Sequence, residues 1–253
     1  MPQEPILYSS ADRISRITLN NPRHHNALGA EEIALFLHLL EQVEKNPDAR
    51  VLLLDARGGD TFCAGASLKQ MRGGTLNGEI FTTLTDRLAA LRIPSVCAVS
   101  GNVFGGGAEI ALCCDYRIGV SGSRLLVPAA RIGICYPLHG LERYVRKLGL
   151  DAALRILVAA EEMPAETLRT IGFLHRLVEA EQLAAESLAY AHYLAGLAPL
   201  AAQSMKQLLL GIAAGQSDPE LERKLRERCA NSNDLQEGLA AQRERRAPRF
   251  EGS

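Results

Sequence analysis

The sequence predicts an α/β fold followed by a C-terminal helical region. Strand-like and helix-like stretches alternate through the first half of the 253 residues, whereas the second half is almost entirely helix-like. This succession is typical of one α/β core with a helical addition. Two short runs of mainly aliphatic residues, 51–56 and 93–100, are typical of buried strands. We therefore expect an α/β core over residues 1–196 and a helical region over residues 197–253.

The first elements follow from the spacing of apolar residues. Residues 6–8 and 14–19, joined by a polar turn at Asp12, are predicted to form a half-buried hairpin because apolar and polar residues alternate in the second segment. Between Ala30 and Lys45 apolar side chains recur at helical spacing, and Pro47 ends the pattern. This stretch is therefore predicted to be an amphipathic helix.

The same periodicities predict the later elements. Extended segments are expected at 116–120, within 124–134, and at 173–178. Helices are expected at the following places: 79–92, 138–148, 151–160, from Pro164 onward, 181–195, 199–214 and 218–245.

Composition limits the possible functions. The net charge of −1 gives no electrostatic reason to expect a nucleic acid or a membrane surface as the main partner, and 47% hydrophobic residues can build a substantial core. Six cysteines lie mostly in apolar runs without C-x-x-C spacing, which is typical of reduced thiols in the cytosol. No run of 18 apolar residues and no signal-like N-terminus is seen, so we expect a cytoplasmic protein.

Residues 101–115, GNVFGGGAEIALCCD, are the most informative stretch. A buried strand is predicted just before them, then come Gly105, Gly106 and Gly107, then an apolar helical run that carries Glu109. Glycines let the backbone approach a ligand closely, and the first turn of a helix presents free N–H groups to negative charge. With Glu109 in that turn, proton transfer and oxyanion stabilisation could act on one substrate carbonyl.

A second loop of small residues follows the strand predicted at 51–56. Ala64, Gly65 and Ala66 come after Phe62 and Cys63, and a helix start follows. Two such loops together can direct two N–H groups at one oxygen. Each loop alone is also compatible with a tight connection between a strand and a helix. A dinucleotide site is disfavoured because the G-x-G-x-x-G spacing is absent and position 129 is alanine.

These two stretches resemble the signature sequences of the crotonase superfamily, the enoyl-CoA hydratase/isomerase group. The resemblance rests on FCAGASLKQM at 62–71 and GNVFGGGAEIALCCDYRI at 101–118, and it extends in the same order to HHNAL at 24–28, LVPAARIGI at 126–134 and EGLAAQRERRAPRF at 237–250. It implies a spiral of ββα units and a C-terminal helical region that supports trimers or hexamers. It also implies a coenzyme A thioester as substrate, with no permanently bound cofactor.

The resemblance also implies roles for individual residues. The backbone N–H groups of Ala66 and Gly106 match the donors that hold the thioester oxygen in the family, and Glu109 matches its catalytic glutamate. Tyr136 resembles the active-site tyrosine of the methylmalonyl-CoA decarboxylase branch, although an ordinary pocket wall is the alternative. We expect coenzyme A to contact the following residues: Arg23, His24, Ala64, Ala66, Leu68, Lys69, Gly106 and Arg245.

The charged residues in that set are also compatible with simple exposure to solvent. The loop that carries Arg23 and His24 fits a solvated turn, and the arginine-rich end around Arg245 fits a solvated helix terminus. The six histidines lack partners at ligand spacing, so no metal site is expected.

The sequence departs from the family pattern at positions that matter for the reaction. Family hydratases carry a second glutamate where this chain has Ala129, many members have aspartate where it has Ser67, and an aromatic residue near the adenine is replaced by Gln242. We expect an enzyme that stabilises a thioester enolate, with hydration of an enoyl-CoA as the leading reaction. A decarboxylase or hydrolase on the same scaffold, and a non-catalytic acyl-CoA-binding protein, remain alternatives.

Overall fold

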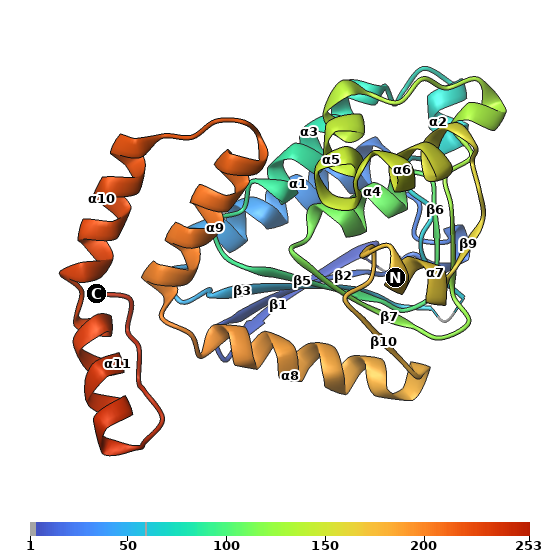
Figure 1. Ribbon diagram of the computed structural model, residues 1–253. Coiled ribbons are helices and arrows are strands. Elements are labelled where there is room, and N and C mark those ends of the chain that lie inside the picture. The colour runs from blue at the N-terminus through green and yellow to red at the C-terminus, as the bar shows by residue number, and fades with distance from the viewer. Residues whose placement is uncertain (1–3, 59) are drawn as a thin grey trace.

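The computed structural model describes residues 4–58 and 60–253, and these contain two β-sheets surrounded by helices (Figure 1). The larger sheet has the strand order β1-β2-β3-β5-β7-β10, and the smaller sheet has the order β4-β6-β8-β9. The strands are β1 (Ile6–Ala11), β2 (Ile14–Leu19), β3 (Val51–Ala56), β4 (Thr61–Cys63), β5 (Ser95–Val99), β6 (Asn102–Phe104), β7 (Tyr116–Val120), β8 (Arg124–Leu126), β9 (Met163–Pro164) and β10 (Arg176–Val178).

The helices cover both faces of the larger sheet. They are α1 (Ala30–Lys45), α2 (Leu68–Arg72), α3 (Gly78–Ala89), α4 (Gly106–Cys113), α5 (Leu138–Leu148), α6 (Leu150–Ala153), α7 (Ala165–Thr170), α8 (Leu183–Ala195), α9 (Pro199–Ala213), α10 (Pro219–Ala230) and α11 (Asn233–Glu244). In Figure 1, α8 lies beneath the larger sheet, whereas α1, α3, α4 and α5 lie above it.

A ββα unit repeats along the chain. Three times, a strand of the larger sheet is followed by a strand of the smaller sheet and then by a helix: β3-β4-α2, β5-β6-α4 and β7-β8-α5. Within each sheet the successive strands of this repeat pair in parallel. The expected spiral of ββα units is therefore confirmed, and the loop after each smaller-sheet strand leads into a helix on the same side of the molecule.

Strand β3 shows why a continuous aliphatic run predicts a doubly covered strand. Successive side chains of a strand point to opposite faces. Leu52 and Leu54 join the large core, which also contains side chains of α1, α3 and α4. Val51 and Leu53 belong to a second cluster with Leu183, Ala191 and Leu194 of α8. Both faces of β3 are thus buried.

Several predicted elements match the structure closely. The helices expected at 30–45 and 138–148 are α1 and α5, and the predicted hairpin is the antiparallel pair β1-β2. Four cysteines are buried as expected, whereas Cys135 is exposed and Cys229 is partly buried; all six are free thiols.

Three predicted elements need correction. The single helix expected at 218–245 is two helices, because Ser232 interrupts the first and caps the second through a hydrogen bond from the Leu235 N–H to its hydroxyl. The helix expected at 151–160 is α6 followed by a π-helical turn at Leu154–Val158. The loop expected before the glycines contains β6. Strands of two or three residues, such as β6 and β9, are too short for a periodic pattern.

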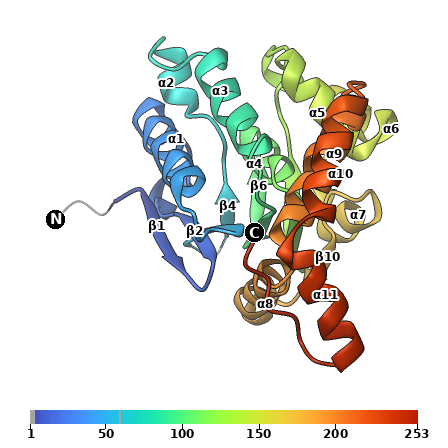
Figure 2. The same cartoon turned by 90° about the vertical axis from the view of Figure 1, so that its left-hand side faces the viewer.

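The C-terminal helices extend away from the core (Figures 1 and 2). Lys206 of α9 donates to the Asp115 carboxylate at 2.6 Å and to the Ile93 carbonyl at 2.8 Å. The final segment returns so that Arg50 donates to the Phe250 carbonyl at 2.6 Å. The division expected at residue 196 stays a prediction, since these contacts join the helical region to the core.

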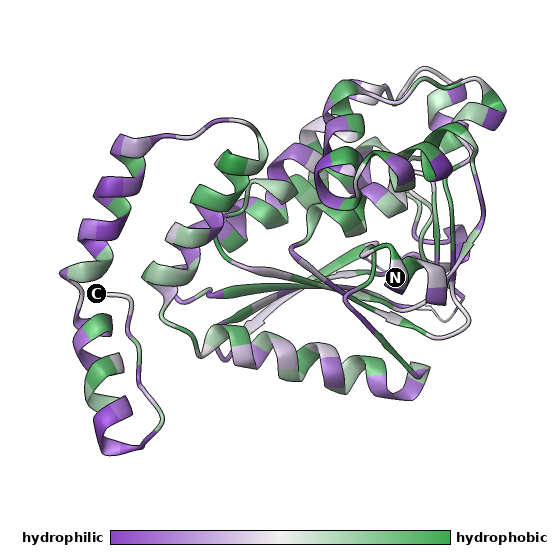
Figure 3. Cartoon of the chain, viewed as in Figure 1, coloured by the Kyte–Doolittle hydropathy of each residue, from purple (hydrophilic) through white to green (hydrophobic). Residues whose placement is uncertain are grey.

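The surface of α10 is strongly polar, whereas α9 carries more apolar residues (Figure 3). Among the described residues, no helix is both long and apolar enough to cross a membrane.

Candidate active site

The two small-residue loops meet backbone to backbone, and glycines make that contact possible. A Cβ at Gly65 would lie 2.6 Å from the amide nitrogen of Gly107, and one at Gly107 would lie 2.7 Å from the carbonyl carbon of Cys63. Gly65 also has a φ of +76°, which side chains disfavour. Any residue larger than glycine at these two positions would push the loops apart.

The segment before α1, which contains Asn26 and Leu28, holds the loop at residues 64–66 in place. The Asn26 side chain donates to the carbonyls of Thr61 at 3.3 Å and Phe62 at 3.0 Å, at the start of the loop. Leu28 then continues the contact, because its N–H donates to the Gly65 carbonyl and its carbonyl accepts from the Ser67 N–H. This pairing uses the Gly65 carbonyl and the Ser67 N–H and leaves the N–H of Ala66 itself unused.

The N–H groups of these loops that have no acceptor among the described residues include those of Ala66 in the first loop and of Gly106, the first residue of α4, in the second. The neighbouring Gly105 N–H, by contrast, donates to the Leu126 carbonyl at 2.9 Å. A pair of free donors at adjoining loops can bind one carbonyl oxygen and stabilise negative charge on it.

Both residues line a cavity of about 520 Å³. Its walls are mainly apolar, with a small number of polar side chains, as is typical of ligand sites. The lining includes His25, Ala64, Ala66, Leu68, Met71, Asn77, Phe81, Phe104, Gly106, Glu109, Val127, Pro128, Ala129, Ile132, Ile134 and Tyr136.

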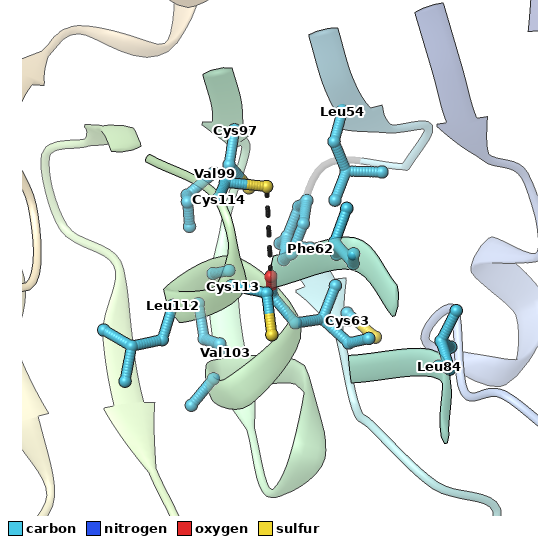
Figure 4. Close-up of a cluster of buried hydrophobic side chains, with 14 of the residues drawn as sticks. Leu54, Phe62, Cys63, Leu84, Cys97, Val99, Val103, Leu112, Cys113 and Cys114 are labelled. Carbon is cyan, nitrogen blue, oxygen red and sulfur yellow. Dashed lines mark hydrogen bonds between the residues drawn. The ribbon is translucent and has the colours of Figure 1, made fainter. Parts of the chain in front are cut away.

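A buried cluster supports the two loops from behind (Figure 4). Phe62 and Cys63 of β4, Val103 of β6, and Leu112 of α4 are each no more than 1% exposed. Burial of a large apolar side chain contributes on the order of 1.5 to 3 kcal/mol. The sequence thus anchors the residues next to each glycine in the core, which fixes where the loop amides lie.

Glu109 is the carboxylate of the cavity, in the first turn of α4 and three residues after Gly106. Its side chain is only 4% exposed and forms an ion pair with Arg143 of α5. Burial raises the pKa of Glu109, while the positive charge of Arg143 and the nearby hydroxyl groups of Thr85 and Tyr136 oppose this increase. The carboxyl is therefore a stronger base than an exposed glutamate.

Tyr136 lies beside Glu109 with a buried hydroxyl that lacks a hydrogen-bond partner of good geometry within the described residues. The Tyr144 hydroxyl has the same property, and the two rings pack edge to face at 5.9 Å. Burial raises the pKa of Tyr136 well above its usual range, so the phenol stays protonated and can donate. Gly140 of α5 makes room for it, since a Cβ there would lie 2.7 Å from the Tyr136 ring.

Ala129 lines the same cavity next to Pro128 and is 9% exposed. The position at which the resemblance implied a second glutamate in the hydratases therefore lies at the cavity wall, and here its side chain is only a methyl group. Within the described residues, Glu109 is the one carboxylate that lines this cavity.

The residues expected to contact coenzyme A divide into two sets. Ala64, Ala66, Leu68 and Gly106 line the cavity. Arg23, His24 and Lys69 are exposed and do not line it, and His25 lies there instead of His24. Arg245 ends α11, which lies on the opposite side of the molecule from α2 in both Figure 1 and Figure 2.

Sequence reasoning missed Arg143, Asp86 and Phe81. Arg143 lies within a predicted helix, where a charged residue ordinarily faces solvent. Phe81 packs against the glycine loop so closely that a Cβ at Gly106 would overlap its ring. Among the described residues, no three His, Cys, Asp or Glu side chains are grouped so that they could hold a metal ion.

The comparisons with known proteins agree on one family. The family model described as "Enoyl-CoA hydratase/isomerase" matches residues 10–253. A probable enoyl-CoA hydratase of Mycobacterium bovis is 29% identical over 99% of both chains, and an (E)-benzylidenesuccinyl-CoA hydratase of Thauera aromatica is 30% identical over 98% of this chain and 100% of that protein. The crystal structure of an enoyl-CoA hydratase/carnithine racemase from Magnetospirillum magneticum, 28% identical, has a TM-score of 0.93 over 99% of this chain and 97% of the other.

Proposed function

Because this chain belongs to the enoyl-CoA hydratase/isomerase family, we propose that it is an enzyme that binds an acyl-CoA thioester and stabilises its enolate. The observation that carries this proposal is the pair of N–H groups of Ala66 and Gly106, which lack acceptors among the described residues and border the same cavity as Glu109. The thioester oxygen accepts hydrogen bonds from both amides. One such donor is worth about 2.7 to 4 kcal/mol of transition-state stabilisation.

Hydration of an enoyl-CoA is the leading reaction. The Glu109 carboxylate takes a proton from water, the water oxygen bonds to the β-carbon, and the electron pair of the double bond moves toward the thioester oxygen. A proton then adds to the α-carbon and the carbonyl reforms. Glu109 is the group that moves or orients the proton, and the two amides hold the charge between the steps.

A decarboxylase or hydrolase reaction is the second candidate, and Ala129 together with Tyr136 favours it. The wall at Ala129 offers no second carboxylate to share a water molecule with Glu109. The buried Tyr136 hydroxyl offers a proton to an enolate that forms without base, by loss of carbon dioxide from a carboxylated acyl group. The carbon–carbon electron pair left behind becomes the enolate, which the tyrosine or water then protonates.

The coenzyme A moiety extends from the cavity past Ala64 and Leu68, the latter of which is 48% exposed. Arg23, His24 and Lys69 are exposed on this chain and available to phosphate groups near the mouth of the cavity. Arg245 would contact coenzyme A only in a second copy of the chain, since α11 lies on the opposite side of the molecule from α2 (Figures 1 and 2), whose Leu68 lines the cavity.

Turnover of a panel of CoA thioesters, followed by mass spectrometry, tests the proposed function. The panel includes enoyl, β-hydroxyacyl, carboxylated and saturated acyl groups. We expect the mass to rise by one water for an enoyl substrate or to fall by one carbon dioxide for a carboxylated one. Glu109→Gln should lower the rate of turnover by about 10²- to 10⁴-fold. Glu109→Gln should still bind the thioester. If the natural protein binds the thioesters and converts none of them, a non-catalytic acyl-CoA-binding role replaces the enzyme.

A further inference from the structure

A chain of four ionisable side chains leads from Glu109 to the surface. Arg143 donates through Nη1 to Glu109 and through Nη2 to Asp86 at 2.8 Å, and the other Asp86 oxygen lies 2.6 Å from His139 Nδ1. The side chains of Glu109, Arg143, Asp86 and His139 are 4%, 10%, 38% and 58% exposed, respectively. Arg143 is therefore a bridge between one buried and one partly exposed carboxylate.

Stability alone does not account for a buried pair at this position. Removal of two charges from water is so unfavourable that apolar residues of similar volume are often at least as stabilising as a buried ion pair. The rest of the cavity wall is mainly apolar, and Tyr144, the residue after Arg143, is fully buried. A charge at position 143 is therefore better explained by what it does to Glu109.

We propose that Arg143 is a positioning residue that keeps Glu109 ionised and fixes the direction of its carboxylate in the cavity, with Asp86 holding the guanidinium in place. The role of Glu109 in turnover rests on the proposed function. The ionisation of Glu109 does not, because it can be measured without a substrate.

The geometry explains how Arg143 can act on the cavity and remain charged. Arg143 also lines a second cavity of about 610 Å³, together with residues of α3, α5 and α9. The Arg143 side chain keeps 10% of its surface exposed, whereas Glu109 keeps only 4%. The planar fork of arginine reaches both carboxylates at once, which a lysine ammonium would do less well.

Several groups change the pKa of Glu109, and some raise it whereas others lower it. Burial raises the pKa of Glu109, Arg143 opposes this, and Asp86 adds a smaller increase by charge repulsion. The titratable or charged groups that face it or its cavity are the following: Arg143 and Tyr144 of α5, Cys135 and Tyr136 before α5, Asp86 of α3, Cys113 of α4 itself, and His25. Loss of Arg143 would leave burial unopposed, so the pKa of Glu109 would rise, whereas loss of the Asp86 charge would lower it.

The direct test is a titration of the Glu109 carboxyl by NMR, in protein labelled with ¹³C at glutamate side chains, with Glu109→Gln to assign the signal. In Arg143→Met the midpoint should move to higher pH, and in Asp86→Asn to lower pH. Arg143→Lys keeps the charge and should titrate close to the natural protein. Arg146→Gln is the matched control, since Arg146 lies on the same helix and pairs with the exposed Glu142; it should leave the midpoint unchanged.

Turnover of the best thioester gives the second readout. The acid limb of the pH profile should move with the NMR midpoint in each variant. Arg143→Lys should keep the natural limb and lose about 10-fold or more in kcat, because one ammonium cannot bridge both carboxylates. Thermal melts identify variants that fail to fold. If Arg143→Met does not fold, Asp86→Asn and Arg143→Lys still test the proposal, because each keeps a positive charge at position 143.

An unchanged Glu109 midpoint in folded Arg143→Met, or an equal shift in Arg146→Gln, would overturn the proposal. If the natural protein converts no thioester, the proposed function fails, yet the titration still decides whether Arg143 sets the ionisation of Glu109.

Discussion

A Cβ at Gly65 would overlap the amide nitrogen of Gly106, so the two loops of the site are in direct backbone contact. These residues are 41 positions apart in the sequence. The free N–H groups of Ala66 and Gly106 adjoin this contact, and their separation therefore depends on the absence of a side chain at Gly65.

Gly65→Ala should nearly abolish turnover. The added methyl would displace Gly106, and one misplaced oxyanion donor lowers kcat by about 10²- to 10³-fold. Gly74→Ala is the matched control, because Gly74 has a similar φ of +72° but open space around its Cβ position. Steady-state kinetics should show the loss in Gly65→Ala alone. Equal losses in both variants would mean that backbone strain, and not the displaced amide, is responsible.

Ala129→Glu should increase hydration of a short enoyl-CoA such as crotonyl-CoA. The natural protein should hydrate it slowly, because a missing general acid or base lowers the rate by about 10²- to 10⁴-fold. The new carboxylate would enter the cavity that Glu109 lines. Loss of the absorbance of the conjugated double bond measures the rate, and a thermal melt detects overpacking at this 9% exposed position. Rapid hydration by the natural protein would show that another group replaces the second glutamate.

Lys147→Met should stabilise the protein at pH 7, and the gain should disappear at high pH. Burial, aided by repulsion from Arg117, lowers the pKa of Lys147 to about 8 from 10.5. Below pH 8 the folded protein must hold an unfavourable ammonium, whereas above 10.5 the lysine is neutral in both states, so stability rises with pH between these values.

We expect a gain of about 2 kcal/mol at pH 7, after subtraction of the hydrogen bond from Lys147 to the Cys114 carbonyl. Urea unfolding of both proteins at pH 7 and pH 10 measures it. A stability difference that does not shrink toward high pH would contradict the assigned cause.

The chain should assemble into a species of three or six copies. Met205, Leu209 and Ile212 of α9 are 58%, 63% and 60% exposed, and their spacing places them on one side of that helix. Light scattering should report the assembled mass, and Leu209→Asp should reduce it. A monomer at micromolar concentration would refute this prediction.

The local pattern of residues was sufficient for much of the fold. Apolar spacing and the following Pro47 placed α1 correctly, and the helix predicted at 138–148 is α5, because helix periodicity and helix ends are encoded within a few residues. The aliphatic run at 51–56 predicted a doubly covered strand for the same reason. The prediction was wrong at β6, because a strand of three residues is too short to show a periodic pattern. It was also wrong at Ser232, where one capping side chain divides a long helical pattern into two helices.

For the site, the sequence by itself determined the chemical groups: two small-residue loops, one glutamate after the glycines, and no glutamate at Ala129. Only the tertiary structure decided which amides lack acceptors among the described residues, that His25 and not His24 lines the cavity, and that Arg143 pairs with Glu109 from 34 residues away. Periodicity tells whether a side chain faces inward, but ionisation and hydrogen bonding depend on distances between segments that meet only when the chain is folded.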